Sequence, residues 1–310
     1  MHKEVLRLAA LLAGIALATS RIGLIVHELV AHGGMALAVG AEVIDVQLFW
    51  FAGGWIRYQY PDPSLAGVLA IAMAGIALEL VVGAALWLLV RGRTLGRRLV
   101  RGMGATLVIH ATWYLATGAF HGFGDGLVLY RSLGDARIPV AIGAGLVTCA
   151  AAYFAAKSVL GALAATLPGS TRARVIGVVV AALLAGGLHA GLTAGELALR
   201  SDPTYSAAMQ PQRDRNIALE LARWQRDQAA RGVAIDDGAR RVERARLAAK
   251  HKTFPFVWLL AVATAASVIA GAVRTRKVED ERITNRLLAL TLGIAAVSIC
   301  AVIVLDLLLM

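Results

Sequence analysis

The clearest pattern along the chain is a series of apolar runs of about 18 residues or more, a length that predicts membrane-spanning helices. Short polar or basic segments separate these runs. We predict seven spans, which cover roughly residues 5–38, 64–90, 102–122, 138–159, 175–198, 255–273 and 286–308. Because the first span is longer than one crossing needs, we expect it to bend or to emerge around Gly33 and Gly34.

Two segments depart from this pattern. Residues 43–60 alternate apolar and polar positions around Gly53-Gly54 and end at two prolines, which predicts a β-hairpin. The tryptophans and tyrosines of this hairpin suit a membrane interface. The polar segment 202–252 predicts two helices separated by the sequence GVAIDDG, which would form a small helical hairpin outside the membrane.

The composition agrees with a membrane protein. Of the 310 residues, 58% are hydrophobic and only 16% are charged, whereas soluble domains carry about 25% charged residues. An ordinary soluble enzyme and a disordered protein are therefore excluded. The two cysteines, Cys149 and Cys300, both lie inside apolar runs, which argues against a disulfide scaffold.

We therefore predict an all-α polytopic membrane protein with about seven spans, a short membrane-associated β-hairpin and a small helical extramembrane insert. Residues 1–130 form a membrane core that contains the hairpin at about 43–60, and residues 131–200 add further spans. Residues 201–253 form the extramembrane helical hairpin, and residues 254–310 form a C-terminal pair of spans.

The net charge of +11 would fit either nucleic-acid binding or basic cytoplasmic loops, and the membrane pattern favours the loops. Basic residues crowd three short connections between spans: Arg91, Arg93, Arg97, Arg98 and Arg101; Arg172 and Arg174; and Arg274, Arg276, Lys277 and Arg282. If the N-terminus is cytoplasmic, all three connections are cytoplasmic as well, and residues 202–252 lie outside. We expect a multi-pass protein of a bacterial cytoplasmic membrane, surrounded by lipid, with no nucleic-acid partner.

Ionisable side chains inside the predicted spans mark candidate chemistry, because each costs about 2.5–3.5 kcal/mol at the centre of a span. The densest group is His27, Glu28 and His32, within the sequence VHELVAHGG. Other candidates are Glu79, His110, His121, His189, Glu196 and Asp306, together with Asp125 just after the third span. We expect His110 and His189 to be ordinary core histidines, and Glu196 and Asp306, near span ends, to reach the interface.

The first group differs by one residue from the zinc motif H-E-x-x-H, in which two histidines hold the metal and the glutamate activates water. Here the order is H-E-x-x-x-H, and five residues of regular α-helix leave the two imidazoles roughly 140° apart. A π-bulge would bring His27 and His32 onto one face. Alternatively, Glu28 and His32, four residues apart, could be the two metal ligands while His27 has another role.

The order of these motifs resembles the site-2 protease family of intramembrane zinc metallopeptidases. In that family a helix with H-E-x-x-H precedes a membrane-associated β-hairpin, and a later helix supplies an aspartate in a pattern like N-x-x-P-x-x-x-x-D-G. The corresponding stretch here is TGAFHGFGDG, in which Asp125 and Gly126 match the last two positions. Thr117 and Phe120 replace the asparagine and the proline. The resemblance covers about residues 5–130.

The resemblance implies an intramembrane zinc metalloprotease. His27, His32 and Asp125 would be zinc ligands and Glu28 the general base, with His121 or Glu79 as an additional ligand or as a partner of one. The hairpin from Val43 to Tyr60 would hold a strand of a membrane-protein substrate. The family arrangement places such a site nearer the cytoplasm, whereas the arginine distribution places it nearer the outside.

Other functional classes fit parts of the pattern. A non-catalytic scaffold or binding protein on a protease-like fold would use the first motif only as a buried polar network. A transporter would explain the ionisable groups in the spans but not the hairpin beside them. A di-iron hydroxylase needs more ligands than seven scattered histidines supply. Metal content separates a zinc protease from a scaffold or a transporter.

Overall fold

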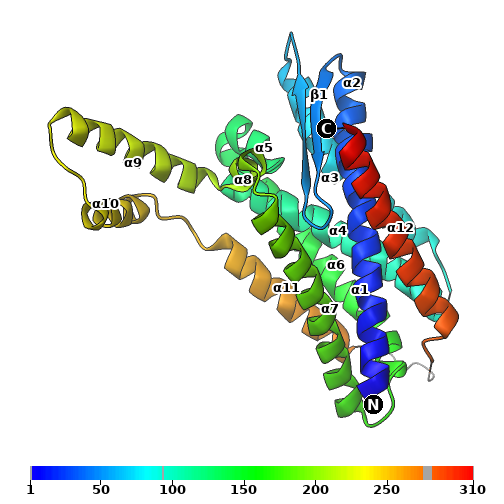
Figure 1. Ribbon diagram of the computed structural model, residues 1–310. Coiled ribbons are helices and arrows are strands. Elements are labelled where there is room, and N and C mark those ends of the chain that lie inside the picture. Colours follow the sequence, from blue (N-terminus) through cyan, green and yellow to red (C-terminus); the bar gives the residue numbers. More distant parts are fainter. Residues whose placement is uncertain (1, 93, 275–280, 310) are drawn as a thin grey trace.

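The structure, a computed structural model, describes residues 2–92, 94–274 and 281–309. Figure 1 shows long helices packed side by side, with a small sheet at one end. The elements of the N-terminal half are α1 (His2–Ile25), the π-helix η1 (Val26–Gly33), α2 (Gly34–Ala38), β1 (Glu42–Leu48), β2 (Gly54–Gln59), α3 (Leu65–Leu89) and α4 (Leu95–His121). Three of the basic loop residues, Arg93, Arg276 and Lys277, lie outside the described residues.

The described part of the remaining chain is mainly helical. Its elements are α5 (Gly126–Ser132), the short 3₁₀ turn η2 (Gly134–Ala136), α6 (Arg137–Ala165), α7 (Thr171–Leu199), α8 (Pro203–Met209), α9 (Gln212–Ala230), α10 (Asp237–Lys250), α11 (Phe256–Val273) and α12 (Asn285–Leu309). The predicted extramembrane hairpin corresponds to α9 and α10, and α8 is a third helix that the sequence did not indicate.

Among the described residues, six helical segments are long and apolar enough to cross a membrane, which indicates a multi-pass membrane protein. Seven were predicted, and the predicted third span, now α4, does not qualify. Its first turns carry Arg97, Arg98 and Arg101, and His110 and Tyr114 lower the hydropathy of the remainder. A less apolar sequence suits its position, because α4 packs against both α3 and α6.

The first apolar run is one continuous helical segment from His2 to Ala38. We expected a bend at Gly33-Gly34, but Gly34 has helical backbone angles and the helix continues through it. The departure from α-helical geometry occurs earlier, over Val26–Gly33, where the chain forms a π-helix. This is the segment that carries the first motif.

The two ends of the bundle differ in character. Leu8, Leu99 and Leu167 belong to one apolar cluster, so the start of α1, the start of α4 and the α6–α7 connection lie together. The described basic connections are therefore at the same end as the N-terminus. The hairpin and the C-terminus lie at the opposite end (Figure 1). There the backbone N–H of Gly124 donates to the carbonyl oxygen of Ala208 at 2.9 Å, which joins the α4–α5 loop to the insert.

The predicted hairpin is confirmed as a two-stranded antiparallel sheet, irregular between Val43 and Asp45. Strand β1 contacts α12, and β2 contacts η1. Within the described chain, β2 pairs only with β1. The second edge of β2 therefore has no strand partner among the residues that the structure describes.

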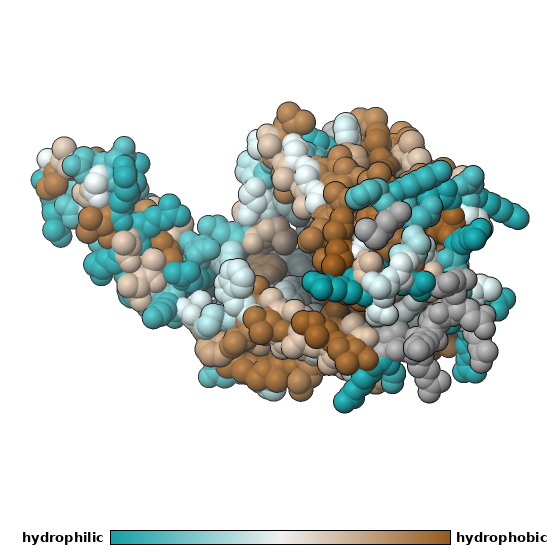
Figure 2. Space-filling view, turned by 90° about the horizontal axis from the view of Figure 1, so that it is seen from below, coloured by the Kyte–Doolittle hydropathy of each residue, from teal (hydrophilic) through white to brown (hydrophobic). Residues whose placement is uncertain are grey.

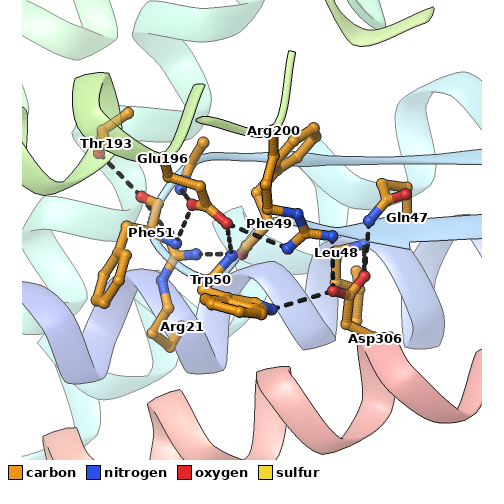
Figure 3. A network of polar contacts seen from close by, with 11 residues as sticks. Arg21, Gln47, Leu48, Phe49, Trp50, Phe51, Thr193, Glu196, Arg200 and Asp306 are labelled. Carbon is orange, nitrogen blue, oxygen red and sulfur yellow. Dashed lines mark hydrogen bonds and ion pairs between the residues drawn. The ribbon is translucent and has the colours of Figure 1, made fainter. Parts of the chain in front are cut away.

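Buried carboxylates from two distant helices fix the turn of the hairpin (Figure 3). Glu196 of α7 accepts the backbone N–H groups of Trp50, Phe51 and Ala52 at 2.5, 2.6 and 2.9 Å. Its side chain is buried and also pairs with Arg200. We expected Glu196 to reach the interface. The turn instead offers three N–H groups that need an acceptor away from water.

Asp306 of α12 has a similar role and is fully buried. It accepts hydrogen bonds from the Gln47 side chain, the Leu48 backbone and the Trp50 indole at 2.7, 3.2 and 3.1 Å. Arg200 completes its surroundings at 2.8 Å. The expectation that Asp306 reaches the interface is therefore wrong, because the hairpin covers this end of α12.

A third helix, α1, contributes a positively charged side chain to the same hairpin turn. The guanidinium of Arg21 in α1, which is 3% exposed, donates to the carbonyl oxygens of Phe49 and Phe51 at 2.8 and 3.1 Å. Figure 3 shows Arg21, Glu196 and Asp306 converging on the same turn from three elements. Buried charged groups thus set the position of the hairpin relative to α1, α7 and α12. The sequence pattern singled out Glu196 and Asp306, but it revealed neither Arg21 nor the contacts of these groups with the turn.

Helices α9 and α10 project from the bundle as an arm (Figure 1). Ile217 and Leu247 are buried apolar side chains of the arm. Glu220 pairs with Lys250 and His251 at 2.7 and 2.8 Å, and these contacts lower the pKa of its carboxyl. Figure 2 shows mainly hydrophilic side chains on the arm, in contrast to the hydrophobic flanks of the bundle.

Candidate metal centre

Three potential metal ligands from separate parts of the core converge. His27 and His32 lie on η1, and Asp125 lies in the loop between α4 and α5. One ligand atom from each lies within 4.8 Å of the other two. The Nε2 atoms of His27 and His32 are 3.1 and 3.4 Å from Oδ2 of Asp125.

The π-helix explains how two histidines five residues apart can meet. Regular α-helix would rotate them roughly 140° apart, whereas a π-turn adds one residue and returns the fifth residue to the same face. The ring centroids of His27 and His32 lie 4.7 Å apart with an interplanar angle of 76°. The prediction that the helix departs from α-geometry here is confirmed. Glu28 is not a member of the ligand cluster found among the described residues.

The other ring nitrogen of each histidine is also occupied. Nδ1 of His32 lies 2.6 Å from the carbonyl oxygen of Ile71, and Nδ1 of His27 lies 3.1 Å from Oε1 of Glu79. A carbonyl oxygen can only accept, so Nδ1 of His32 carries a proton and donates it. A carboxylate likewise favours a proton on Nδ1 of His27. In the neutral rings, both Nε2 atoms then present lone pairs toward Asp125.

This arrangement directs acceptor atoms at one another. Two imidazole lone pairs and an ionised carboxylate oxygen repel at 3.1–3.4 Å unless a cation or protons lie between them. Either both rings are protonated, which gives a metal-free ionic network, or one metal ion occupies the space. Glu28 and Glu79 add two further carboxylates nearby, so the surroundings favour positive charge.

The separations fit a metal ion. Zinc–ligand bonds of about 2.0–2.1 Å at tetrahedral angles place ligand atoms about 3.3 Å apart. The two N···O distances, 3.1 and 3.4 Å, bracket this value, and all three ligand atoms lie within 4.8 Å of one another. Two imidazoles and one carboxylate are also a donor set used by catalytic zinc sites, which keep a fourth position open.

Close packing positions His27 against α3. A Cβ atom at Gly75 would approach the His27 ring to within 2.5 Å, so only glycine leaves room for the imidazole there. Nearby on the same helix, Glu79 receives Nδ1 of His27 on one oxygen and Nδ1 of His110 on the other, at 3.1 and 2.9 Å. The predicted role of Glu79 as a partner of a ligand therefore has a matching geometry.

Close packing also positions Asp125. A Cβ atom at Gly126 would collide with the backbone of Gly118 in α4, so the loop can approach α4 only with glycine at this position. The backbone N–H of Asp125 donates to the hydroxyl of Tyr114 at 3.4 Å. The Asp-Gly pair of the sequence thus combines a ligand with the residue that lets the loop reach it.

A cavity of about 660 Å³ opens beside the cluster, and its lining includes Glu28, His32, Asp125 and Tyr114. Glu28 is 8% exposed, and among the described residues no hydrogen bond to its carboxylate is found. The side chain of Glu28 lies close to Gly54 of β2. A Cβ atom added at Gly54 would lie 3.2 Å from Cγ of Glu28. The carboxylate is therefore next to the cluster, at the start of β2, and available to a bound molecule.

The remaining candidate residues lie elsewhere. His121, expected as an additional ligand, is at the end of α4 with its ring 4.9 Å from that of Phe120, outside the ligand cluster of the described residues. His189 lies in α7. Sequence reasoning missed Tyr114 and the Ile71 carbonyl, because neither a lone tyrosine in a helix nor a backbone oxygen carries a motif.

Comparisons with known proteins add no relationship. No protein-family model, curated protein or solved structure matches the chain. The function must therefore be argued from the arrangement of the site.

Proposed function

We propose that the protein is an intramembrane zinc endopeptidase, in which His27, His32 and Asp125 hold the metal. The observation that supports this most strongly is the convergence of two Nε2 lone pairs and one carboxylate oxygen at 3.1–3.4 Å. The Nδ1 contacts to Glu79 and to the Ile71 carbonyl would keep both rings in the orientation that binding requires. The resemblance of the motif order to the site-2 protease family agrees with this proposal.

Zinc would supply a Lewis acid that polarises a carbonyl group and makes water more acidic. The chain itself supplies the proton acceptor. Glu28 lies next to the ligands without being one, and its carboxylate lines the cavity. It would take a proton from the attacking water and deliver it to the amide nitrogen as the C–N bond breaks.

The substrate would be a membrane-spanning or membrane-proximal segment of another protein in extended form, because a helix hides its carbonyl groups in hydrogen bonds. Strand β2 lines the cavity and has no strand partner on its second edge in the described chain. An extended peptide could add to this edge by main-chain hydrogen bonds, as in other cases of strand addition. Such a peptide would pass Glu28 at Gly54.

We also propose that the N-terminus is cytoplasmic. The described basic residues of the short connections lie at the N-terminal end of the bundle, and loops rich in arginine stay preferentially in the cytoplasm. The cavity, the hairpin and the arm would then lie toward the outside. This differs from the orientation that the family resemblance implies.

The deciding experiment compares wild type with Glu28→Gln, which keeps the size of the side chain and removes the base. Both proteins should contain about one zinc per chain, and only wild type should cleave co-expressed single-span substrates. Loss of acid–base catalysis alone lowers a rate by about 10²–10⁴-fold. Equal cleavage by both would exclude Glu28 as the base. Metal-free protein that binds but does not cleave such substrates would favour the scaffold function.

A further inference from the structure

The cavity beside the metal centre has a wall that does not belong to the membrane core. Residues Tyr205, Ala207, Ala208 and Met209 of α8, with Ala218 and Leu219 of α9, line it together with β2 and α5. We call the segment 203–219 the insert wall. Nothing in the first motif, in the hairpin or in the Asp-Gly loop requires this segment, so its presence at the site needs a separate explanation.

The insert wall is attached to both elements that frame the metal centre. Ala208 accepts the backbone N–H of Gly124, which directly precedes Asp125, at 2.9 Å. On the hairpin side, the indole of Trp55 donates to Asp202, just before α8, at 3.1 Å. The ring of Tyr205 lies 4.9 Å from that of Phe49. Because these contacts reach both sides of the cavity, the wall is a fixed part of the site.

The backbone carbonyl groups at the C-terminal end of α8 accept hydrogen bonds from a side chain of the insert itself. The guanidinium of Arg215 donates to the carbonyl oxygens of Ala207, Ala208 and Gln210 at 2.7, 3.1 and 3.0 Å. These are the carbonyl groups that the end of a helix leaves without intrahelical partners. With its donors used in this way, Arg215 joins α8 to α9, and the side chains that remain toward the cavity are mainly apolar.

Large apolar side chains of the wall are left exposed. Leu219 is 66% exposed and Met209 is 37% exposed, although both line the cavity. Leu127 and Val128 of α5 and Ile56 of β2 extend the apolar lining toward the metal centre. Because burying apolar surface away from water is favourable, a ligand with a bulky apolar group would bind better than one without.

From this arrangement we infer that the insert wall is the specificity element of the site. It selects extended peptide segments that carry a large aliphatic side chain, such as leucine, on the face turned toward the wall. The inference rests on the proposed peptidase function, because the unpaired edge of β2 supplies the main-chain partner. Strand β2 would pair with the main chain at one edge of the bound strand, and the wall would contact the side chains on one of its faces, with the polar cluster beneath it.

The test measures peptide binding and cleavage separately. Two fluorescein-labelled 12-residue peptides of alternating valine and threonine carry either leucine or glycine at the centre. Their affinities are measured by anisotropy with zinc-loaded Glu28→Gln in nanodiscs, while wild type is assayed for cleavage by mass spectrometry. Ala218→Trp fills the cavity from an exposed position on the wall. Ala229→Trp, exposed near the far end of the same helix, is the matched control.

We expect the leucine peptide to bind about tenfold more tightly than the glycine peptide, the scale typical of hydrophobic pockets. Ala218→Trp should reduce this preference to less than about twofold, whereas Ala229→Trp should keep it. A preference unchanged by Ala218→Trp, or absent in every protein, overturns the inference. If the preference depends on the wall but wild type cleaves neither peptide, the specificity element stands and the peptidase proposal fails. If wild type cleaves both peptides with no dependence on the wall, the peptidase proposal stands and the specificity element fails.

Discussion

The imidazoles of His27 and His32 lie 4.7 Å apart between ring centroids, although five residues of helix separate them. On a regular α-helix these side chains would point roughly 140° apart. The π-turn over Val26–Gly33 removes this difference and leaves both Nε2 atoms directed at Asp125. A sequence one residue longer than H-E-x-x-H can therefore present the same pair of donors.

Replacing one of these histidines should remove the metal. We expect His32→Ala to lose most of its zinc, because two remaining donors do not complete a site that uses three protein ligands. Zinc per chain is measured by elemental analysis of protein purified without added metal. His189→Ala, which removes a histidine of α7, is the matched control and should retain wild-type zinc. Equal zinc in all three proteins would rule out His32 as a ligand.

Glu79 should affect metal affinity without contacting the metal. Its carboxylate holds Nδ1 of His27 at 3.1 Å, and loss of such a partner typically lowers metal affinity by about 10–100-fold. We expect a shift of this size for Glu79→Ala in competition with a chelator. His110→Ala should have a smaller effect, because His110 contacts Glu79 and not a ligand. A larger effect of His110→Ala than of Glu79→Ala would contradict this order.

The hairpin turn should loosen when its buried acceptor is removed. Glu196→Leu leaves the N–H groups of Trp50, Phe51 and Ala52 without their acceptor, at a cost of about 1–3 kcal/mol for each buried group. We expect faster amide exchange over residues 47–54 by mass spectrometry. Glu243→Leu on the distant arm removes a carboxylate that pairs only locally with Arg246 and should leave that exchange unchanged. Unchanged exchange in Glu196→Leu would show that the turn is held by other contacts.

The sequence predicted the elements that follow from period and composition. Long apolar runs indicated the helices, and alternation around Gly53-Gly54 indicated the sheet. The off-register spacing of His27 and His32 left two arrangements open, and the structure has the one that uses a π-helix. In each case the signal is local, because a span, a hairpin or a helical turn depends on residues close together in the chain.

The contacts between distant segments could not be predicted in this way. Glu196 and Asp306 looked like charges near the ends of apolar runs, and Arg21, inside the first run, was not singled out; only their approach to one turn explains all three. The insert wall is similar, since a short helix lines the cavity through contacts such as the hydrogen bonds from Gly124 to Ala208 and from Trp55 to Asp202. Such partners lie tens to hundreds of residues apart, and no periodicity connects them.

The orientation in the membrane can be tested with single cysteines. In a background in which Cys149 and Cys300 are replaced by serine, Thr94→Cys reports on the basic end and Arg231→Cys on the tip of the arm. Both positions are exposed. We expect a membrane-impermeant maleimide to label Arg231→Cys in spheroplasts and Thr94→Cys only after permeabilisation, because arginine-rich loops stay in the cytoplasm. The reverse pattern would establish the orientation implied by the family resemblance.

The π-turn makes a further prediction about chain length. A π-turn is an α-helix with one added residue, so removing that residue should restore a regular helix without rotating its flanks. Deleting Val30, which is 59% exposed, changes HELVAH into the four-residue spacing of H-E-x-x-H. The two histidines would then lie on one face of an α-helix. We therefore expect the Val30 deletion to fold and to bind about one zinc per chain.

A deletion in the regular part of the same helix is the control. Removing Ile22, which is 45% exposed, rotates the preceding turns of α1 by about 100° relative to the histidines. Arg21 would then no longer meet the hairpin turn while η1 keeps its contacts with α3. We expect this protein to be strongly destabilised in thermal unfolding and to retain little zinc. If the Val30 deletion folds like wild type but binds no zinc, His27 and His32 do not share a metal, and the polar cluster is a hydrogen-bonded network.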